Sequence, residues 1–312
     1  MKISRFLIFA AVIALAISCS SDNPLKRYDF VYAGEWDTRK PDMQSLFTVR
    51  GGKVVSRYII PMHDEWGRIQ EFDDVKLLPD GSIVYAAMSQ LGILDRKGGL
   101  VWQYICPEGT ESHTCQPLDA DRVYFSANGN PAKIVIYNWK KEEVENEIII
   151  PTTVTRTHAQ LRHVRITPEG NFVVGLLGER KLLELAPDGS VVNEIDGVKA
   201  WHAEKLENGN YLIAGDNTRC VKELDRDGNT VWEITQEDVP FPLHNIQTAY
   251  KRPNGNVIFN DWIAGQDTST WAGTVQFCEM TPSKEIVWTL SSWENPDLGP
   301  STAIEIIRQR VK

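Results

Sequence analysis

Residues 201–234 read WHAEKLENGNYLIAGDNTRCVKELDRDGNTVWEI, and this stretch decides the fold of the whole chain. Runs of alternating apolar and polar residues are separated by Glu-Asn-Gly-Asn at 207–210 and by Arg-Asp-Gly-Asn at 226–229. Asn-Gly and Asp-Gly between such runs are a strong hairpin signal, because the favoured turns need φ > 0 at their central residues. The stretch therefore predicts one four-stranded antiparallel unit.

The same pattern recurs along the chain. HVRITPEGNFVVGLL and DVKLLPDGSIVYAAM both repeat HAEKLENGNYLIAGD. First strands recognised in this way lie 39–54 residues apart, in or near the roughly 40–50 residues of a propeller blade. They start at Asp74, Thr114, His163, His202, Thr248 and Thr302. Six starts predict an all-β fold, a six-bladed β-propeller over residues 28–312.

The two ends of this predicted propeller complement each other. Only three strands, near residues 28–33, 46–49 and 54–59, precede the first complete blade. At the other end, the strand at 302–306 has no partner strands after it. We expect the last strand to become the innermost strand of the first blade, because this closes the ring and leaves no open sheet edge.

The N-terminus resembles a bacterial export signal. A basic segment precedes an apolar run over residues 6–17, and Cys19 follows small residues. Cys19 resembles the lipidated cysteine of a lipoprotein, so we expect a signal peptide at 1–18 and a tether at 19–27; a secretory signal with a chance cysteine is the alternative. Lipidation predicts localisation in the bacterial cell envelope, on either side of the outer membrane, with the lipid anchor as the only membrane contact.

Charge and cysteine content limit the partners. The formal net charge is −9 at pH 7 and becomes −11 without the two basic residues of 1–18. Such a body repels nucleic acids, so none is expected as a partner. The sequence has no CxxC pair or paired zinc spacing, so it predicts no metal site, and it indicates no particular cofactor. Cys106 and Cys115 flank a polar loop and could form a disulfide in an oxidising compartment.

One face of the propeller is expected to carry the function. Within each blade, the turns between strands one and two and between strands three and four are tight, whereas the remaining loops and the blade-to-blade connections are longer and richer in reactive and aromatic residues. Binding groups concentrate on loops held by a rigid scaffold. Glu35, Trp36 and Trp66 belong to this face. The candidate ligand-binding residues are Asp74, His113, Thr114, Arg156, His158, Arg162, Trp201, Arg219, His244, Thr248 and Trp262.

His163 and His202 are the candidate catalytic residues. Each lies seven residues before the glycine of its turn, so the two are expected at equivalent positions on neighbouring blades, at the mouth of the central channel. Adjacent imidazoles can exchange protons near neutral pH, accept a transferred group or bind a metal. The alternative is a polar residue that repeats around the channel and binds water.

The repeats also resemble a known group. Units of the form HxxKLxNGNYLIA followed by ELDRDGNTVWEI resemble PQQ-like propeller repeats, and the leading histidine is similar to the pattern of the bacterial arylsulfotransferase family. The resemblance implies six blades and a sulfuryl group carried on a channel histidine. It implies that role for His163 or His202, with Arg162 and Arg219 as candidates for binding the anion.

Three functions are compatible with these observations. The first is a binding module for a carbohydrate or small anionic ligand, acting in glycan uptake or degradation beside protein partners of the envelope. The second is an enzyme on the same face, which transfers a sulfuryl group or cleaves an acidic polysaccharide as a lyase or hydrolase. The third is a protein-interaction platform. We favour the first, because spacing identifies no complete set of nucleophile, base and orienting residue.

Overall fold

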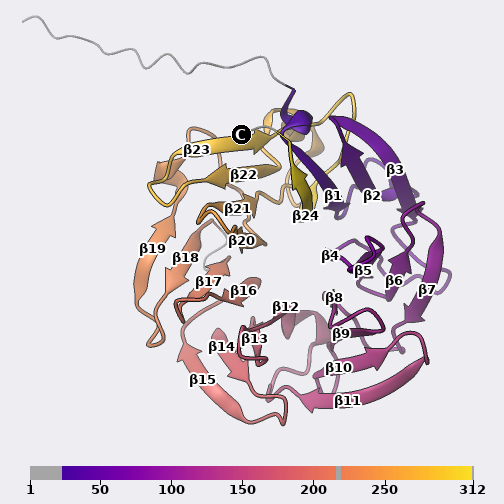
Figure 1. The fold of residues 1–312 in the computed structure, drawn as a ribbon, viewed down its shortest axis with the longest axis vertical. Coiled ribbons are helices and arrows are strands. Elements are labelled where there is room, and N and C mark those ends of the chain that lie inside the picture. The colour runs from indigo at the N-terminus through magenta and orange to yellow at the C-terminus, as the bar shows by residue number, and fades with distance from the viewer. Residues whose placement is uncertain (1–22, 216–218, 311–312) are drawn as a thin grey trace, which may run out of the picture.

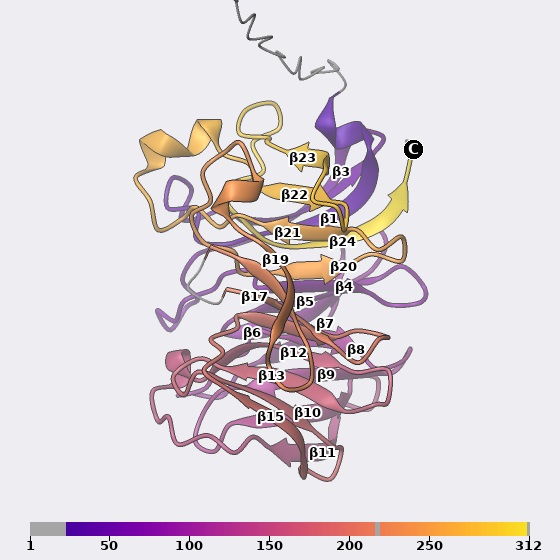
Figure 2. The same cartoon turned by 90° about the vertical axis from the view of Figure 1, so that its left-hand side faces the viewer.

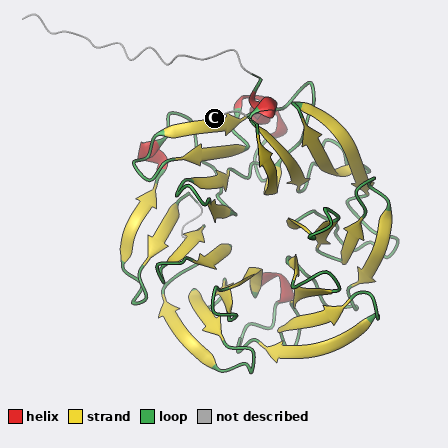
Figure 3. Cartoon of the chain, in the orientation of Figure 1, coloured by secondary structure: helices red, strands yellow, loops and turns green. Residues whose placement is uncertain are grey.

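Six antiparallel four-stranded sheets form a ring (Figure 1) in a computed structural model that describes residues 23–215 and 219–310. The described chain is almost entirely strand and loop (Figure 3). The predicted all-β, six-bladed propeller is therefore confirmed. The expected signal peptide and Cys19 lie outside the described residues.

The first blade combines both ends of the described chain, in the order β24-β1-β2-β3. Its strands are β24 (Ser301–Gln309), β1 (Tyr28–Gly34), β2 (Gln44–Arg50) and β3 (Lys53–Ile60). β24 runs antiparallel to β1 and places Glu305 opposite Val31 and Ala303 opposite Ala33. This pairing bears out the expected ring closure, with a strand longer than the predicted 302–306.

Each of the other five blades consists of four consecutive strands, and the first of them in the chain is the innermost (Figure 1). The second contains β4 (Asp74–Leu77), β5 (Ile83–Ala87), β6 (Gln90–Leu94) and β7 (Leu100–Ile105). The third contains β8 (Cys115–Pro117), β9 (Arg122–Ala127), β10 (Lys133–Asn138) and β11 (Glu143–Ile149). The fourth contains β12 (Leu161–Ile166), β13 (Phe172–Leu176), β14 (Lys181–Leu185) and β15 (Val191–Asp196). The fifth contains β16 (His202–Lys205), β17 (Tyr211–Ala214), β18 (Val221–Leu224) and β19 (Thr230–Ile234), and the sixth contains β20 (Ala249–Lys251), β21 (Val257–Asn260), β22 (Phe277–Met280) and β23 (Ile286–Leu290).

The hydrophobic core lies between neighbouring blades. Successive residues of a strand point to opposite faces of its sheet, so one strand contributes to two such layers. In β1, Phe30 packs in the cluster that contains Phe277 of the sixth blade, whereas Val31 packs in the cluster that contains Tyr85 of the second blade. Burial of both faces explains why the inner strands have nearly continuous apolar runs.

Four short 3-10 helices complete the described structure. They are η1 (Pro24–Lys26), η2 (Thr157–Ala159), η3 (Gln236–Asp238) and η4 (Thr268–Gly273). In η1, Leu25 is buried, and the carbonyl of Pro24 accepts a hydrogen bond of 2.9 Å from the indole of Trp288. The end of the expected tether, residues 24–27, thus packs against the propeller. Among the described residues, no helix has the length and hydropathy to cross a bilayer.

The two faces of the ring differ in their loops. In the edge-on view, η4 lies on one side and the C-terminal end of β24 on the other (Figure 2). The side with η4 carries the longer loops and the blade-to-blade connections, and it is the face that the sequence predicted to be functional.

The four cysteines in the described residues are not joined to one another. Cys106, Cys115, Cys220 and Cys278 are all buried and form no disulfide with one another. Burial raises the pKa of Cys106 to about 12, so its thiol stays protonated at neutral pH. The disulfide that the sequence allowed between Cys106 and Cys115 is therefore not formed in this structure.

Asp29 links β1 to the end of β24, and this contact is expected to make stability depend on pH. Burial by itself raises the pKa of Asp29, but hydrogen bonds from Arg310, the Gly51 amide and Arg308 outweigh it and lower the pKa to about 2. The folded pKa is below the unfolded value, so the stabilisation is present above pH ~4 and is lost as the pH falls towards 2.

We expect Asp29→Asn to lower the free energy of unfolding by about 1–2 kcal/mol at neutral pH, after allowance for solvent screening. Urea unfolding of both proteins at pH 6 and near pH 3 checks this. The difference between them should shrink at the lower pH, and an equal difference at both values contradicts the assignment.

Candidate functional site

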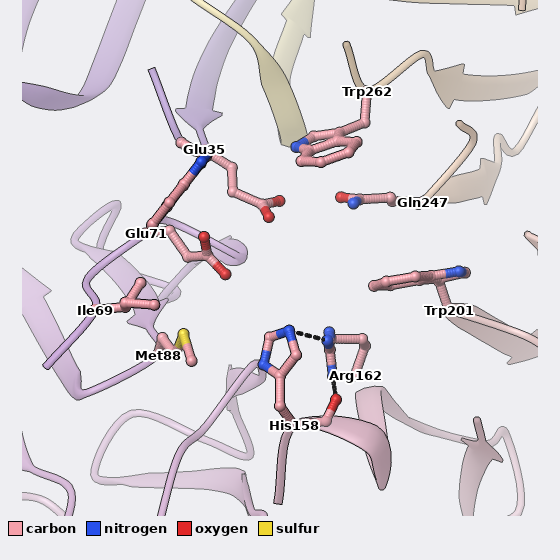
Figure 4. Close-up of a pocket in the computed structure, with 10 residues that line it drawn as sticks. Glu35, Ile69, Glu71, Met88, His158, Arg162, Trp201, Gln247 and Trp262 are labelled. Carbon is pink, nitrogen blue, oxygen red and sulfur yellow. Dashed lines mark hydrogen bonds between the residues drawn. The ribbon is translucent and has the colours of Figure 1, made fainter. Parts of the chain in front are cut away.

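A cavity of about 230 Å³ opens on the predicted functional face. Its wall comes from loops of the first, second and sixth blades and from the segments that lead into the second, fourth, fifth and sixth blades, so it lies over the central channel (Figure 4). The lining residues are Glu35, Trp36, Ile69, Glu71, Met88, His158, Arg162, Trp201, Gln247 and Trp262. Four of them, His158, Arg162, Trp201 and Trp262, were candidates from the sequence.

The residues that precede the predicted inner strands contribute more to this site than the first residues of those strands. The sequence assigned the catalytic role to the first residues His163 and His202, and of the preceding residues it named His113, Arg162 and Trp201 but not Asp73 or Gln247. These preceding residues are Asp73, His113, Arg162, Trp201, Gln247 and Ser301. Three of them line the cavity, and Asp73 and His113 lie beside its Glu71. In the alignment of the repeats, these residues stand one position before the predicted start of each inner strand.

Trp201 and Arg162 form one wall of the cavity. The Arg162 guanidinium lies over the Trp201 ring, 4.8 Å from its centre, and donates hydrogen bonds of 2.7 Å to the backbone carbonyl and to Nε2 of His158. The indole of Trp201 packs against Gly215, whose φ is +113°. A Cβ at Gly215 would collide with that indole, so this glycine allows Trp201 its position.

Two carboxyl groups form the opposite wall. Glu35 and Glu71 are 7% and 6% exposed and point into the cavity (Figure 4). Burial and the nearby Asp73 raise the pKa of Glu35 to about 8, and burial and Glu35 raise the pKa of Glu71 well above its ordinary value. Glu35 accepts a hydrogen bond of 3.0 Å from Thr302, whereas Glu71 has no side-chain hydrogen bond within the described part of the chain. Both are therefore largely carboxylic acids at neutral pH.

Two lining residues have unusual backbone conformations. Trp36 and Met88 follow the second strands of the first and second blades, and both have φ = 55°. A left-handed backbone is uncommon in residues other than glycine and, where it occurs, is concentrated at functional sites. This supports the cavity as the working region of the face.

A hydrogen-bonded network continues from His158 beneath the cavity. Arg162 can only donate, so His158 accepts at Nε2 and donates from Nδ1 to Glu111 Oε1, at 3.1 Å. Glu111 also accepts from Nε2 of the fully buried His113, at 2.9 Å. These two histidines outweigh burial and lower the pKa of Glu111. Burial lowers the pKa of His113, but Asp73 more than offsets this and raises it.

His163 and His202 do lie on neighbouring inner strands, with ring centres 5.4 Å apart, but they are enclosed and do not line the cavity. Burial lowers the pKa of both well below the ordinary value, so both are neutral. His163 donates from Nε2 to the Asp73 carbonyl, at 3.1 Å. Neither nitrogen of His202 has a hydrogen-bond partner among the described residues. They lie beneath the cavity, not at its mouth.

Asp74, Thr114 and Thr248 have structural contacts in the same inner ring. The Asp74 carboxylate accepts hydrogen bonds of 2.9 and 3.1 Å from Arg165. Thr114 donates to the carbonyl of Arg162, and Thr248 donates to the carbonyl of Thr302. The two threonine contacts join neighbouring blades, the Asp74 contact joins the second blade to the fourth, and none of the three side chains lines the cavity.

The remaining candidates lie apart from the cavity wall. Arg156 is exposed before η2, and Arg219 is exposed beside residues 216–218, which lie outside the described part. His244 donates from Nδ1 to Asp261, at 2.7 Å, and burial raises the pKa of Asp261. None of these three side chains lines the cavity beside Trp201.

Comparisons with known proteins are informative about the fold. No family model and no curated protein matches the chain. A crystal structure of a protein of unknown function from Bacteroides caccae is 21% identical, with a TM-score of 0.74 over 89% of this chain and 98% of that one. A catalytically inactive virginiamycin B lyase from Staphylococcus aureus, crystallised with quinupristin, is 10% identical, with a TM-score of 0.57 over 86% and 87% of the two chains. At these identities the chain is similar to both proteins in its propeller fold.

Proposed function

We propose that this protein binds a neutral saccharide in the cavity, as an exported propeller anchored to the envelope by a lipid. The observation that carries the proposal is the presence of three indole side chains, Trp36, Trp201 and Trp262, from three parts of the ring in one small cavity. Sugar rings have apolar faces that pack on aromatic rings and hydroxyl groups that need polar partners. Glu35, Gln247 and Arg162 supply such partners.

The lining residues and the volume of the cavity narrow the range of possible ligands. The carboxyl groups of Glu35 and Glu71 suit the neutral hydroxyl groups of a sugar, and the hydrogen bonds of Arg162 to His158 occupy part of its guanidinium. The volume of about 230 Å³ is below the ~300–1,000 Å³ of drug-sized ligand sites. The cavity therefore suits one sugar ring, at the end or side of a glycan, more than an acidic polymer or an aryl sulfate.

The test is a calorimetric screen of neutral mono- and oligosaccharides. Trp201→Ala and Trp262→Ala are each expected to weaken binding at least tenfold, about 1.4 kcal/mol, because each removes a stacking surface. Trp139→Ala is the matched control, since Trp139 lies in the β10–β11 turn of the opposite face. Saccharide binding that survives both cavity substitutions would place the ligand elsewhere.

An enzyme that cleaves the bound saccharide by acid–base chemistry is the second candidate. It is favoured by the convergence of Glu35 and Glu71 on one cavity, since paired carboxyl groups are the usual machinery for breaking glycosidic bonds. Sulfuryl transfer of the arylsulfotransferase kind has less support, because His163 and His202 are enclosed away from the cavity. Cleavage that Glu35→Gln abolishes while binding persists would favour the enzyme.

The cellular part of the proposal rests on the first 19 residues of the sequence. Export by residues 1–18 and acylation of Cys19 would place the cavity in the envelope, where glycans and partner proteins of glycan uptake are met. Mass spectrometry of membrane-extracted protein tests this, with acylated Cys19 expected as the new N-terminus. A soluble chain that begins at another residue contradicts it.

A further inference from the structure

Three buried side chains beside the cavity hold ligand atoms close together. One nitrogen of His113 and one carboxylate oxygen each from Asp73 and Glu71 lie within 4.8 Å of one another. These residues are 0%, 3% and 6% exposed. We propose that they bind a divalent transition-metal cation. Such a site goes beyond saccharide binding and does not depend on it.

The spacing of two of these atoms is that of neighbouring metal ligands. His113 Nδ1 and Asp73 Oδ2 are 3.0 Å apart, which is an ion-pair distance when His113 is protonated, but neither atom makes an aligned hydrogen bond among the described residues. Two ligand atoms bound to a cation at about 2.1 Å are themselves roughly 3 Å apart when the angle at the metal is near 90°, and about 3.4 Å apart at the tetrahedral angle of Zn²⁺. A cation between them would satisfy both buried atoms.

The hydrogen bond at the other nitrogen of His113, Nε2, also favours metal binding through Nδ1. Its Nε2 donates to Glu111 Oε1 at 2.9 Å, which leaves Nδ1 available as a ligand. A histidine that binds a metal through one nitrogen commonly donates from the other to a carboxylate, which fixes the ring. Glu111 is held in turn by His158, so this outer contact is itself supported.

Glu71 completes the set and indicates the kind of cation. No side-chain hydrogen bond to Glu71 is found in residues 23–215 and 219–310, so its carboxyl group can bind a metal once its proton is released. One imidazole and two carboxylates suit Zn²⁺ or Mn²⁺. Ca²⁺ prefers oxygen ligands alone, and Mg²⁺ keeps most of its water, so neither is expected to bind as well.

Glu111, His113 and His158 form a second compact group, but their hydrogen bonds disfavour it as the metal site. Arg162 donates to Nε2 of His158, so Nδ1 keeps its proton and cannot bind a metal without loss of that contact. Glu111 already accepts from both histidines. These residues therefore act as the outer support of the proposed site.

The experiment is a titration of chelator-treated protein with MnCl₂ and ZnCl₂, followed by calorimetry and, for Mn²⁺, by electron paramagnetic resonance. We expect one cation per chain. Asp73→Asn and His113→Gln should each weaken binding at least tenfold, and Glu111→Gln by about 10–100-fold. His158→Gln should change the affinity by less than about threefold, since its Nδ1 is not a proposed ligand.

His244→Gln is the matched control, because His244 and Asp261 on the same face form an aligned hydrogen bond and leave no unpartnered atom facing a carboxylate. If a variant fails to fold by circular dichroism, the melting temperature of the parent protein with and without metal is decisive, and a chelator-reversible rise is expected. Absence of Mn²⁺ and Zn²⁺ binding at about 1 mM overturns the site. Loss of binding in His158→Gln but not in Asp73→Asn overturns the ligand assignment.

Discussion

Deletion of residues 301–312 is expected to abolish cooperative folding of the propeller. β24 (Ser301–Gln309) is the innermost strand of the first blade, and its residues Ser301, Thr302, Ala303 and Ile304 are buried. Its loss removes the pairing with β1 along the whole of that strand and exposes a row of unpaired backbone groups. It also removes the Thr302 contacts with Thr248 and Glu35.

The expected loss is comparable with the whole stability of an ordinary domain, about 5–15 kcal/mol. Circular dichroism during heating should show no sharp transition for the truncated protein, and the chain should aggregate through its open edge. Deletion of residues 311–312 alone is the control, because these lie beyond β24. A truncated protein with the parental melting temperature would show that the ring does not need this closure.

Breaking the ion pair between Asp74 and Arg165 is the second large effect that we expect. The Asp74 side chain is 0% exposed and that of Arg165 is 10% exposed, and they share two hydrogen bonds in the channel. Burial alone would lower the pKa of Arg165, but the Asp74 carboxylate raises it, so the guanidinium stays charged. Asp74→Ala would leave this buried charge without its partner, at a cost of about 3–5 kcal/mol.

A double variant separates the cost of leaving Arg165 unpaired from the net contribution of the ion pair to the free energy of unfolding. Asp74→Leu with Arg165→Met removes both charges and should recover most of the stability, since apolar replacements of buried ion pairs are often neutral. Glu147→Ala, which breaks the exposed pair with Lys133, should cost less than about 1 kcal/mol. Urea unfolding of all three variants is the measurement. An Asp74→Ala cost as small as that of Glu147→Ala would mean that the channel is well hydrated.

The same ion pair gives Asp74, a ligand-binding candidate from the sequence, a structural contact away from the cavity. From the sequence, Asp74 differs little from the other polar residues that start inner strands. Its partner Arg165 comes from the fourth blade, which is not adjacent to the second blade in the ring, and is 91 residues away in the chain. A carboxylate that is already paired and buried has no capacity left for a ligand in the cavity.

The amino-acid sequence by itself determined the propeller, because its signals are local. Asn208-Gly209 and Asp227-Gly228 specify turns through backbone conformations, and their repetition gives the blades without knowledge of distant contacts. The unpaired strand at the C-terminus determined the ring closure for the same reason. The choice of functional face also followed from loop length and composition.

The tertiary structure alone decided which side chains form the site. Glu71, Asp73, Glu111 and His113 come from two blade connections some 40 residues apart in the chain, and they meet only because the second and third blades are neighbours in the ring. The repeat placed His163 and His202 side by side, but a strand turns successive side chains in opposite directions. His163 and His202 are enclosed, whereas Arg162 and Trp201, one residue earlier in each repeat, lie in the cavity wall. Periodicity alone does not say which of these two positions faces the ligand.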